Sequence, residues 1–191
     1  MSYDIRFPNF KDLKAPTFWE TMGEKGKKSV VINQPSTYPA HEIPGVLVSG
    51  FVAISLKKAV WPLRVLEDLQ KLDYQIDIDT AQARTDHDYL IEELDSTLKG
   101  RLAAVEHFWS QEDWDYFQVV VTGTDRIMHY IWAAYEDGSH QHHQAFVDYF
   151  RKVDGFIGTL SERFAEVSGR SREGEGLFML SDHGFCGIKQ E

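Results

Sequence analysis

The 191-residue sequence contains a single cysteine, Cys186, and no long apolar run. A lone cysteine excludes a disulfide within the chain, which suits a reducing compartment, and we expect a cytoplasmic location. No stretch approaches the ~20 apolar residues that span a bilayer, and the first residues lack the apolar segment of a signal peptide. The sequence therefore predicts no membrane segment in this chain.

Positive charge is also scarce, because 20 Lys and Arg stand against 30 Asp and Glu, for a net charge of −10. Such a chain repels a phosphate backbone, which argues against a nucleic-acid partner. A small phosphate ester remains possible, since bound metal cations can reverse the local field. Hydrophobic residues make up 42% of the chain, enough for the core of one domain.

Strand-like and helix-like patterns alternate along the chain. Apolar residues at three- and four-residue spacing predict helices, and short apolar or alternating runs predict strands. This alternation predicts an α/β fold, a three-layer α/β/α sandwich with a largely parallel sheet. The expected helices cover residues 17–25, 61–72, 85–110, 125–135 and 144–167, and the expected strands cover 29–33, 45–51, 74–79, 116–121 and 177–180.

The first candidate site follows the strand expected at 116–121. Asp125 and His129 are four residues apart, so on a helix they share one face. A carboxylate and an imidazole on one face can bind the same cation, and ligand sites in open α/β sheets lie beyond the carboxyl ends of strands. Taken alone, the pair is better explained as a helix cap and a partly buried polar histidine, because such pairs are common by chance.

The second candidate site follows the strand expected at 177–180. Asp182 and His183 enter a turn at Gly184, where both side chains can reach one metal ion. The alternative is a polar turn in which Asp182 accepts backbone N–H groups.

The two motifs together resemble a known family. Thr-Asp-Arg-Ile-Met-His and Ser-Asp-His-Gly-Phe are similar to two metal-binding motifs of the alkaline phosphatase superfamily, in its type I phosphodiesterase/nucleotide pyrophosphatase (predicted phosphohydrolase/phosphomutase) group. The resemblance implies that Asp125 and His129 help bind one divalent metal ion, and Asp182 and His183 the other. It also implies zinc as the usual metal, manganese as the next candidate, and a small phosphate ester or nucleotide-like substrate.

Other parts of the family's site have no counterpart here. The family uses an earlier Asp ligand, a Thr or Ser nucleophile and a later His ligand, and no residue of this sequence matches them. We therefore expect residues 1–191 to form a single partial catalytic domain with an incomplete alkaline-phosphatase-like core, without a catalytic residue of its own and with little or no activity. The alternative function is a non-catalytic scaffold that forms homo-oligomers through exposed strand edges.

Three more histidines, His140, His142 and His143, lie in the loop before the helix expected at 144–167. They can be interpreted as an extra metal site, although the composition favours an ordinary polar loop.

Overall fold

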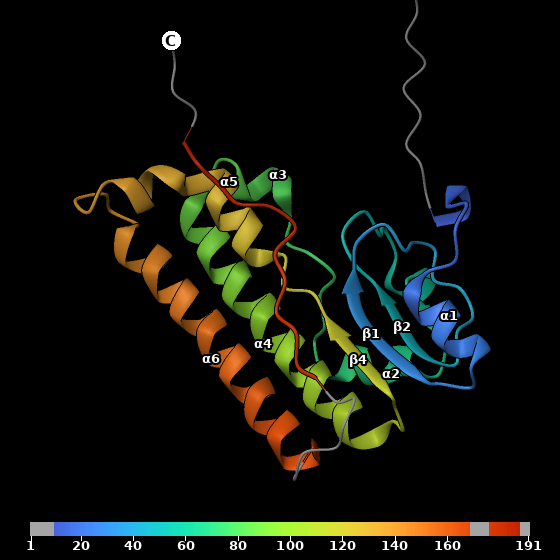
Figure 1. Cartoon of the computed structure of the whole chain (residues 1–191). Helices are drawn as coiled ribbons and strands as arrows, with labels where there is room; N and C mark the ends of the chain where they lie inside the picture. The colour runs from blue at the N-terminus through green and yellow to red at the C-terminus, as the bar shows by residue number, and fades with distance from the viewer. Residues whose placement is uncertain (1–9, 169–175, 188–191) are drawn as a thin grey trace, which may run out of the picture. The chain divides into compact units, whose positions relative to one another are not determined.

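The computed structural model describes residues 10–168 and 176–187, and it shows a mixed α/β fold with a largely parallel sheet, as expected (Figure 1). In chain order the elements are the 3-10 helix η1 (Phe10–Asp12), α1 (Phe18–Glu24), β1 (Ser29–Gln34), β2 (Gly45–Ser49), the 3-10 helix η2 (Leu56–Lys58), β3 (Val60–Trp61), α2 (Val65–Lys71), α3 (Thr80–Ala83), α4 (His87–Gln111), β4 (Tyr116–Val119), α5 (Gly123–Glu136) and α6 (His143–Ser168). No helix among the described residues is long and apolar enough to cross a membrane.

The sheet has the strand order β3-β2-β1-β4. Strands β2 and β4 run parallel to β1, and β3 runs antiparallel to β2. The two central strands are continuous in β-branched and aliphatic residues, as is typical of parallel strands buried on both faces. Their fully buried side chains are Val30, Val31, Ile32, Val46, Leu47 and Val48.

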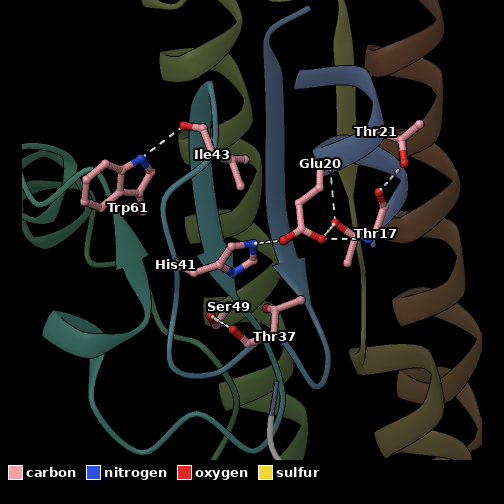
Figure 2. Close-up of polar contacts among 8 residues, drawn as sticks. All are labelled: Thr17, Glu20, Thr21, Thr37, His41, Ile43, Ser49 and Trp61. Atoms are coloured by element: carbon pink, nitrogen blue, oxygen red, sulfur yellow. Dashed lines mark hydrogen bonds and ion pairs between the residues drawn. The ribbon is translucent and has the colours of Figure 1, made fainter. Parts of the chain in front are cut away.

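Helix α1 begins with a capping box (Figure 2). The Thr17 hydroxyl accepts from the backbone N–H of Glu20 at 3.3 Å, and the Glu20 carboxylate accepts from the backbone N–H of Thr17 at 2.6 Å. Two backbone donors that the helix leaves without partners are thereby satisfied. Trp19 is buried and packs in one cluster with Val31 and Leu47, which fixes α1 against the sheet.

His41 lies beside this cap, with its Nε2 3.3 Å from the Glu20 carboxylate (Figure 2). Partial burial lowers the pKa of His41, and the neighbouring Glu20 opposes this only in part. Partial burial also favours a higher pKa for Glu20, but the hydrogen bonds from Thr17 and the charge of His41 outweigh it and lower that pKa. The pair therefore links the stability of this part of the protein to pH.

Chain contacts divide the protein into two compact units: Met1–Ile78 with Ser96–Thr122, and Asp79–Asp95 with Gly123–Glu191. The first unit contains the sheet. The second contains α5, α6 and the beginning of α4, and within it Lys152 of α6 forms an ion pair with Asp95 of α4. Its core is apolar and aromatic, and includes Leu90, Leu94, Ile127, Ile131, Phe146, Tyr149, Val153 and Phe156.

Two of the expected strands are wrong. Residues 74–79 form no strand: the guanidinium of Arg101 donates to the Tyr74 hydroxyl and to the Ile76 carbonyl, and the segment leads into α3, which Asp79 caps. Residues 177–180 are also outside any strand, and their side chains are exposed, up to 90% for Leu180.

The remaining differences concern boundaries and burial. Helix α2 begins only at Val65, because Val60 and Trp61 pair with β2. At the start of α4, Asp86 accepts from the backbone N–H of Tyr89, at 2.9 Å. Strand β4, which ends the row of strands, is half-buried.

Candidate metal centre

Asp125 and His129 lie together on α5, as their spacing predicts. The His129 Nε2 is 3.3 Å from the Asp125 Oδ1. Asp125 is in the first turn of the helix, where the partial positive charge of the helix start stabilises a carboxylate. The opposite face of α5 is anchored by the buried side chains of Ile127, Ile131 and Ala134. The packing therefore leaves the Asp125–His129 face open to solvent.

His183 reaches the same carboxylate from a distant part of the sequence. Its Nε2 is 3.5 Å from the Asp125 Oδ1, and 3.9 Å from the Asp182 Oδ2. Its Nδ1 lies 2.9 Å from the Gly184 carbonyl oxygen, to which a protonated Nδ1 donates. The neutral ring then carries its proton on Nδ1, so that Nε2 presents a lone pair toward Asp125. The structure thus gathers Asp125, His129 and His183.

Local hydrogen bonds shape the turn that carries His183. The Ser181 hydroxyl donates to the His183 carbonyl at 2.6 Å, and the His183 N–H donates to the Asp182 Oδ1 at 3.1 Å. The pKa of His183 is raised, first by its hydrogen bond to the Gly184 carbonyl and then by the charges of Asp182 and Asp125. The raised pKa makes this imidazole more basic than an isolated histidine.

Asp182 does not join the other three residues. Its side chain is 92% exposed, and within the described part of the chain it contacts His183, the next residue. Its hydrogen bond to the His183 N–H is the polar turn that the sequence left open as an alternative. Within residues 10–168 and 176–187, no three His, Cys, Asp or Glu side chains are placed so that together they could hold a metal ion.

An aromatic contact holds the His183 turn against α5. The Phe185 ring lies 4.9 Å from the His129 ring, nearly perpendicular to it, and 4.9 Å from the Trp132 ring. Sequence reasoning did not assign a role to Phe185 or Trp132. The signal was present, because Trp132 lies three residues after His129 and Phe185 directly follows the Asp-His-Gly motif.

Two charged or reactive neighbours do not add to this centre. Arg126 is nearly buried, with its guanidinium 3.8 Å from the Asp125 Oδ2, an ion pair with the carboxylate. Cys186 is a free, exposed thiol.

Comparison with known families shows to which family the chain belongs. The sequence model of the type I phosphodiesterase / nucleotide pyrophosphatase family matches residues 4–191, which is nearly the whole chain, and the protein therefore belongs to this family. Membership is consistent with the alkaline phosphatase superfamily. The family comprises hydrolases of phosphate esters or nucleotides and is generally metal-dependent. No curated protein and no solved structure matches the chain significantly.

Proposed function

We propose that the protein is a metal-dependent phosphate-ester hydrolase whose metal ligands are Asp125, His129, Asp182 and His183. The observation that carries this proposal is the convergence of His129 and His183 on the Asp125 carboxylate, at 3.3 and 3.5 Å. In a tetrahedral zinc site with bonds of about 2.0–2.1 Å, neighbouring donor atoms are roughly 3.3 Å apart. Asp125 and His129, assigned to one cation, already stand at this spacing, and the 3.5 Å approach of His183 to Asp125 brings the ligands of the second cation beside them.

The donor set fits zinc first and manganese second. Imidazole nitrogen and carboxylate oxygen suit both ions, and the described donors include no thiolate that would favour a softer metal. Asp182 would complete the set by turning from solvent toward His183, a rotation that its 92% exposure leaves open. Two cations held in this way would polarise the phosphoryl oxygens and stabilise the leaving oxygen. The side chains of this chain hold and orient the ions, and a small phosphate ester or nucleotide-like molecule is the substrate.

We further propose that this chain by itself turns over phosphate esters slowly or not at all. Four protein ligands divided between two cations give two for each, whereas a catalytic zinc site usually has three. The test measures hydrolysis of nitrophenyl phosphate mono- and diesters with added zinc or manganese. Turnover at background level is expected; a metal-dependent rate that disappears in Asp182→Asn would contradict the proposal of inactivity and support the ligand assignment.

We also place the protein in a reducing, cytoplasmic compartment, because its only cysteine is a free and exposed thiol.

A second candidate function is a self-associating, non-catalytic module, and one observation favours it. Leu177, Phe178, Met179 and Leu180 are all exposed, while β4 ends the row of strands with one side unpaired by the described sheet. An apolar extended segment and an open strand edge are the two halves of a strand-addition contact between copies. Light scattering should show concentration-dependent oligomers that Leu180→Asp reduces, whereas Leu63→Asp, at another exposed leucine just before α2, leaves them unchanged. A monomer at all concentrations would refute this function.

A further inference from the structure

A second group of possible metal ligands lies in the unit that contains α5 and α6, and it uses none of the four residues discussed above. His87 and Asp88 form the first turn of α4, and His140 and His142 belong to the loop before α6. The His142 side chain is only 10% exposed, and its Nδ1 lies 3.6 Å from the Asp88 Oδ1. The His87 and His142 ring centroids are 5.8 Å apart. An imidazole buried beside a second imidazole and a carboxylate is a typical arrangement of a metal site.

We propose that His87, Asp88 and His142 bind one divalent transition-metal ion, with zinc as the best fit, and that this ion ties the first turn of α4 to the loop before α6. Two imidazoles on a tetrahedral zinc have ring centroids roughly 5 Å apart, and neighbouring donors are roughly 3.3 Å apart. The distance between the His87 and His142 ring centroids, 5.8 Å, and the distance from the His142 Nδ1 to the Asp88 Oδ1, 3.6 Å, exceed these values by less than 1 Å. As they stand, the three side chains form no group that could hold a metal ion, and the two rings meet edge to face at 78°, so binding requires His87 and the exposed Asp88 to rotate.

The contacts of His142 point its Nδ1 toward the proposed metal position. Its Nε2 lies 3.0 Å from Nε2 of the Gln141 side-chain amide, and its Nδ1 faces Asp88. With the Gln141 amide turned so that its oxygen accepts, Nε2 carries the proton and Nδ1 presents a lone pair to the metal. Gln141 would thus orient the ligating ring, as residues hydrogen-bonded to metal ligands commonly do.

The neighbouring His140 is excluded as a ligand by its own hydrogen bond. Its Nδ1 accepts from the backbone N–H of His142 at 3.1 Å, so the proton of the neutral ring is on Nε2. His140 therefore positions the loop. The loop is also fixed by the His143 Nδ1, 2.7 Å from the Ala134 carbonyl, and by the His143 N–H, which donates to the His140 carbonyl at 2.9 Å. Because these hydrogen bonds hold the loop in place without a metal ion, the loop loses little conformational entropy when the ion binds.

The test titrates zinc into the full chain carrying Asp125→Asn and His129→Gln, which removes the centre on α5. Calorimetry should show about one equivalent of zinc bound in this background. His142→Gln and, separately, His87→Gln should weaken that binding by roughly tenfold or more, since losing even a residue that orients a ligand costs about 10–100-fold. His87 is only half-buried, so its variant keeps the test valid if His142→Gln fails to fold.

Two variants are matched controls. His107→Gln removes an imidazole that lies 3.5 Å from the Asp68 carboxylate, but no second imidazole lies beside it in the described part of the chain. His140→Gln removes the histidine that positions the loop. Both should keep zinc affinity within a few-fold. A second readout is the zinc-induced rise in thermal unfolding midpoint, which should be present in the background protein and lost with His87→Gln. No zinc binding in the background, or equal losses in the His107 and His87 variants, would overturn the proposal.

Discussion

Gly123, the first residue of α5, is the position where the structure makes the sharpest stability prediction. A Cβ atom built on Gly123 would lie 1.8 Å from the Tyr149 hydroxyl oxygen, 2.8 Å from its Cζ and 3.2 Å from the Leu94 Cδ2. Tyr149 is 1% exposed, so it cannot turn into solvent to make room. Gly123→Ala must therefore displace either α6 or the first turn of α5, which carries Asp125.

The expected cost follows from overpacking of a filled core. An added methyl group that forces such a shift destabilises a protein by about 1–3 kcal/mol. The same substitution at Gly155, inside α6, meets no atom within 4 Å. There the gain in helix propensity should stabilise the protein by roughly 0.5–1 kcal/mol. The same Gly-to-Ala substitution should therefore destabilise the protein at Gly123 and stabilise it at Gly155.

Urea unfolding followed by far-UV circular dichroism measures both variants. A double-mutant cycle with Tyr149→Phe adds a further check, because removing the hydroxyl relieves the closest contact while the ring carbon at 2.8 Å stays tight. Gly123→Ala should therefore cost less in the Tyr149→Phe background than in the native one, without becoming neutral. The packing argument fails if Gly123→Ala is as stable as the native protein, or if the Gly123 and Gly155 variants shift in the same direction.

Two further predictions concern the cap and its histidine. Thr17→Ala removes the capping box of α1 and should destabilise the protein by about 1 kcal/mol, whereas Thr17→Ser should retain most of the stability; denaturant midpoints of the two variants would decide this. The pKa of His41 is lower in the folded protein than the ordinary 6.5, so its contribution to stability is present above pH 6.5 and declines as the pH falls below that value. Unfolding midpoints measured across this range should depend less on pH in His41→Gln, and an unchanged pH profile would show that another group titrates there.

The sequence predicted the helices and strands that can be recognised from the spacing of apolar residues within the element itself. Helices α4, α5 and α6 have apolar residues at three- and four-residue spacing, which only a helix brings to one face. Strands β1 and β2 are continuous aliphatic runs, the pattern of central parallel strands. The strand predicted at residues 74–79 is absent because the segment has no strand partner in the described sheet, and Tyr74 and Ile76 instead hydrogen-bond to Arg101, which is distant in sequence. An alternating sequence pattern alone does not imply a sheet.

The candidate site was also only partly predictable from the sequence. The Asp125–His129 pair follows from helix geometry, since residues four apart on one helix face each other. The approach of His183 to Asp125 has no such local cause, and it was suggested only because the two motifs resemble one family. The packing of Phe185 on His129 and Trp132 belongs to tertiary structure that periodicity does not encode.

The most direct test of the metal centre is a zinc titration of the chain carrying His87→Gln, which removes the second proposed site. We predict zinc binding that Asp125→Asn weakens by roughly tenfold or more, and that His129→Gln and His183→Gln weaken likewise, because both imidazoles converge on one Asp125 carboxylate oxygen. Asp113→Asn, at an exposed carboxylate paired with Lys28, should leave the affinity unchanged. Zinc affinity that is insensitive to Asp125, His129 and His183 would contradict the assignment of these residues as metal ligands.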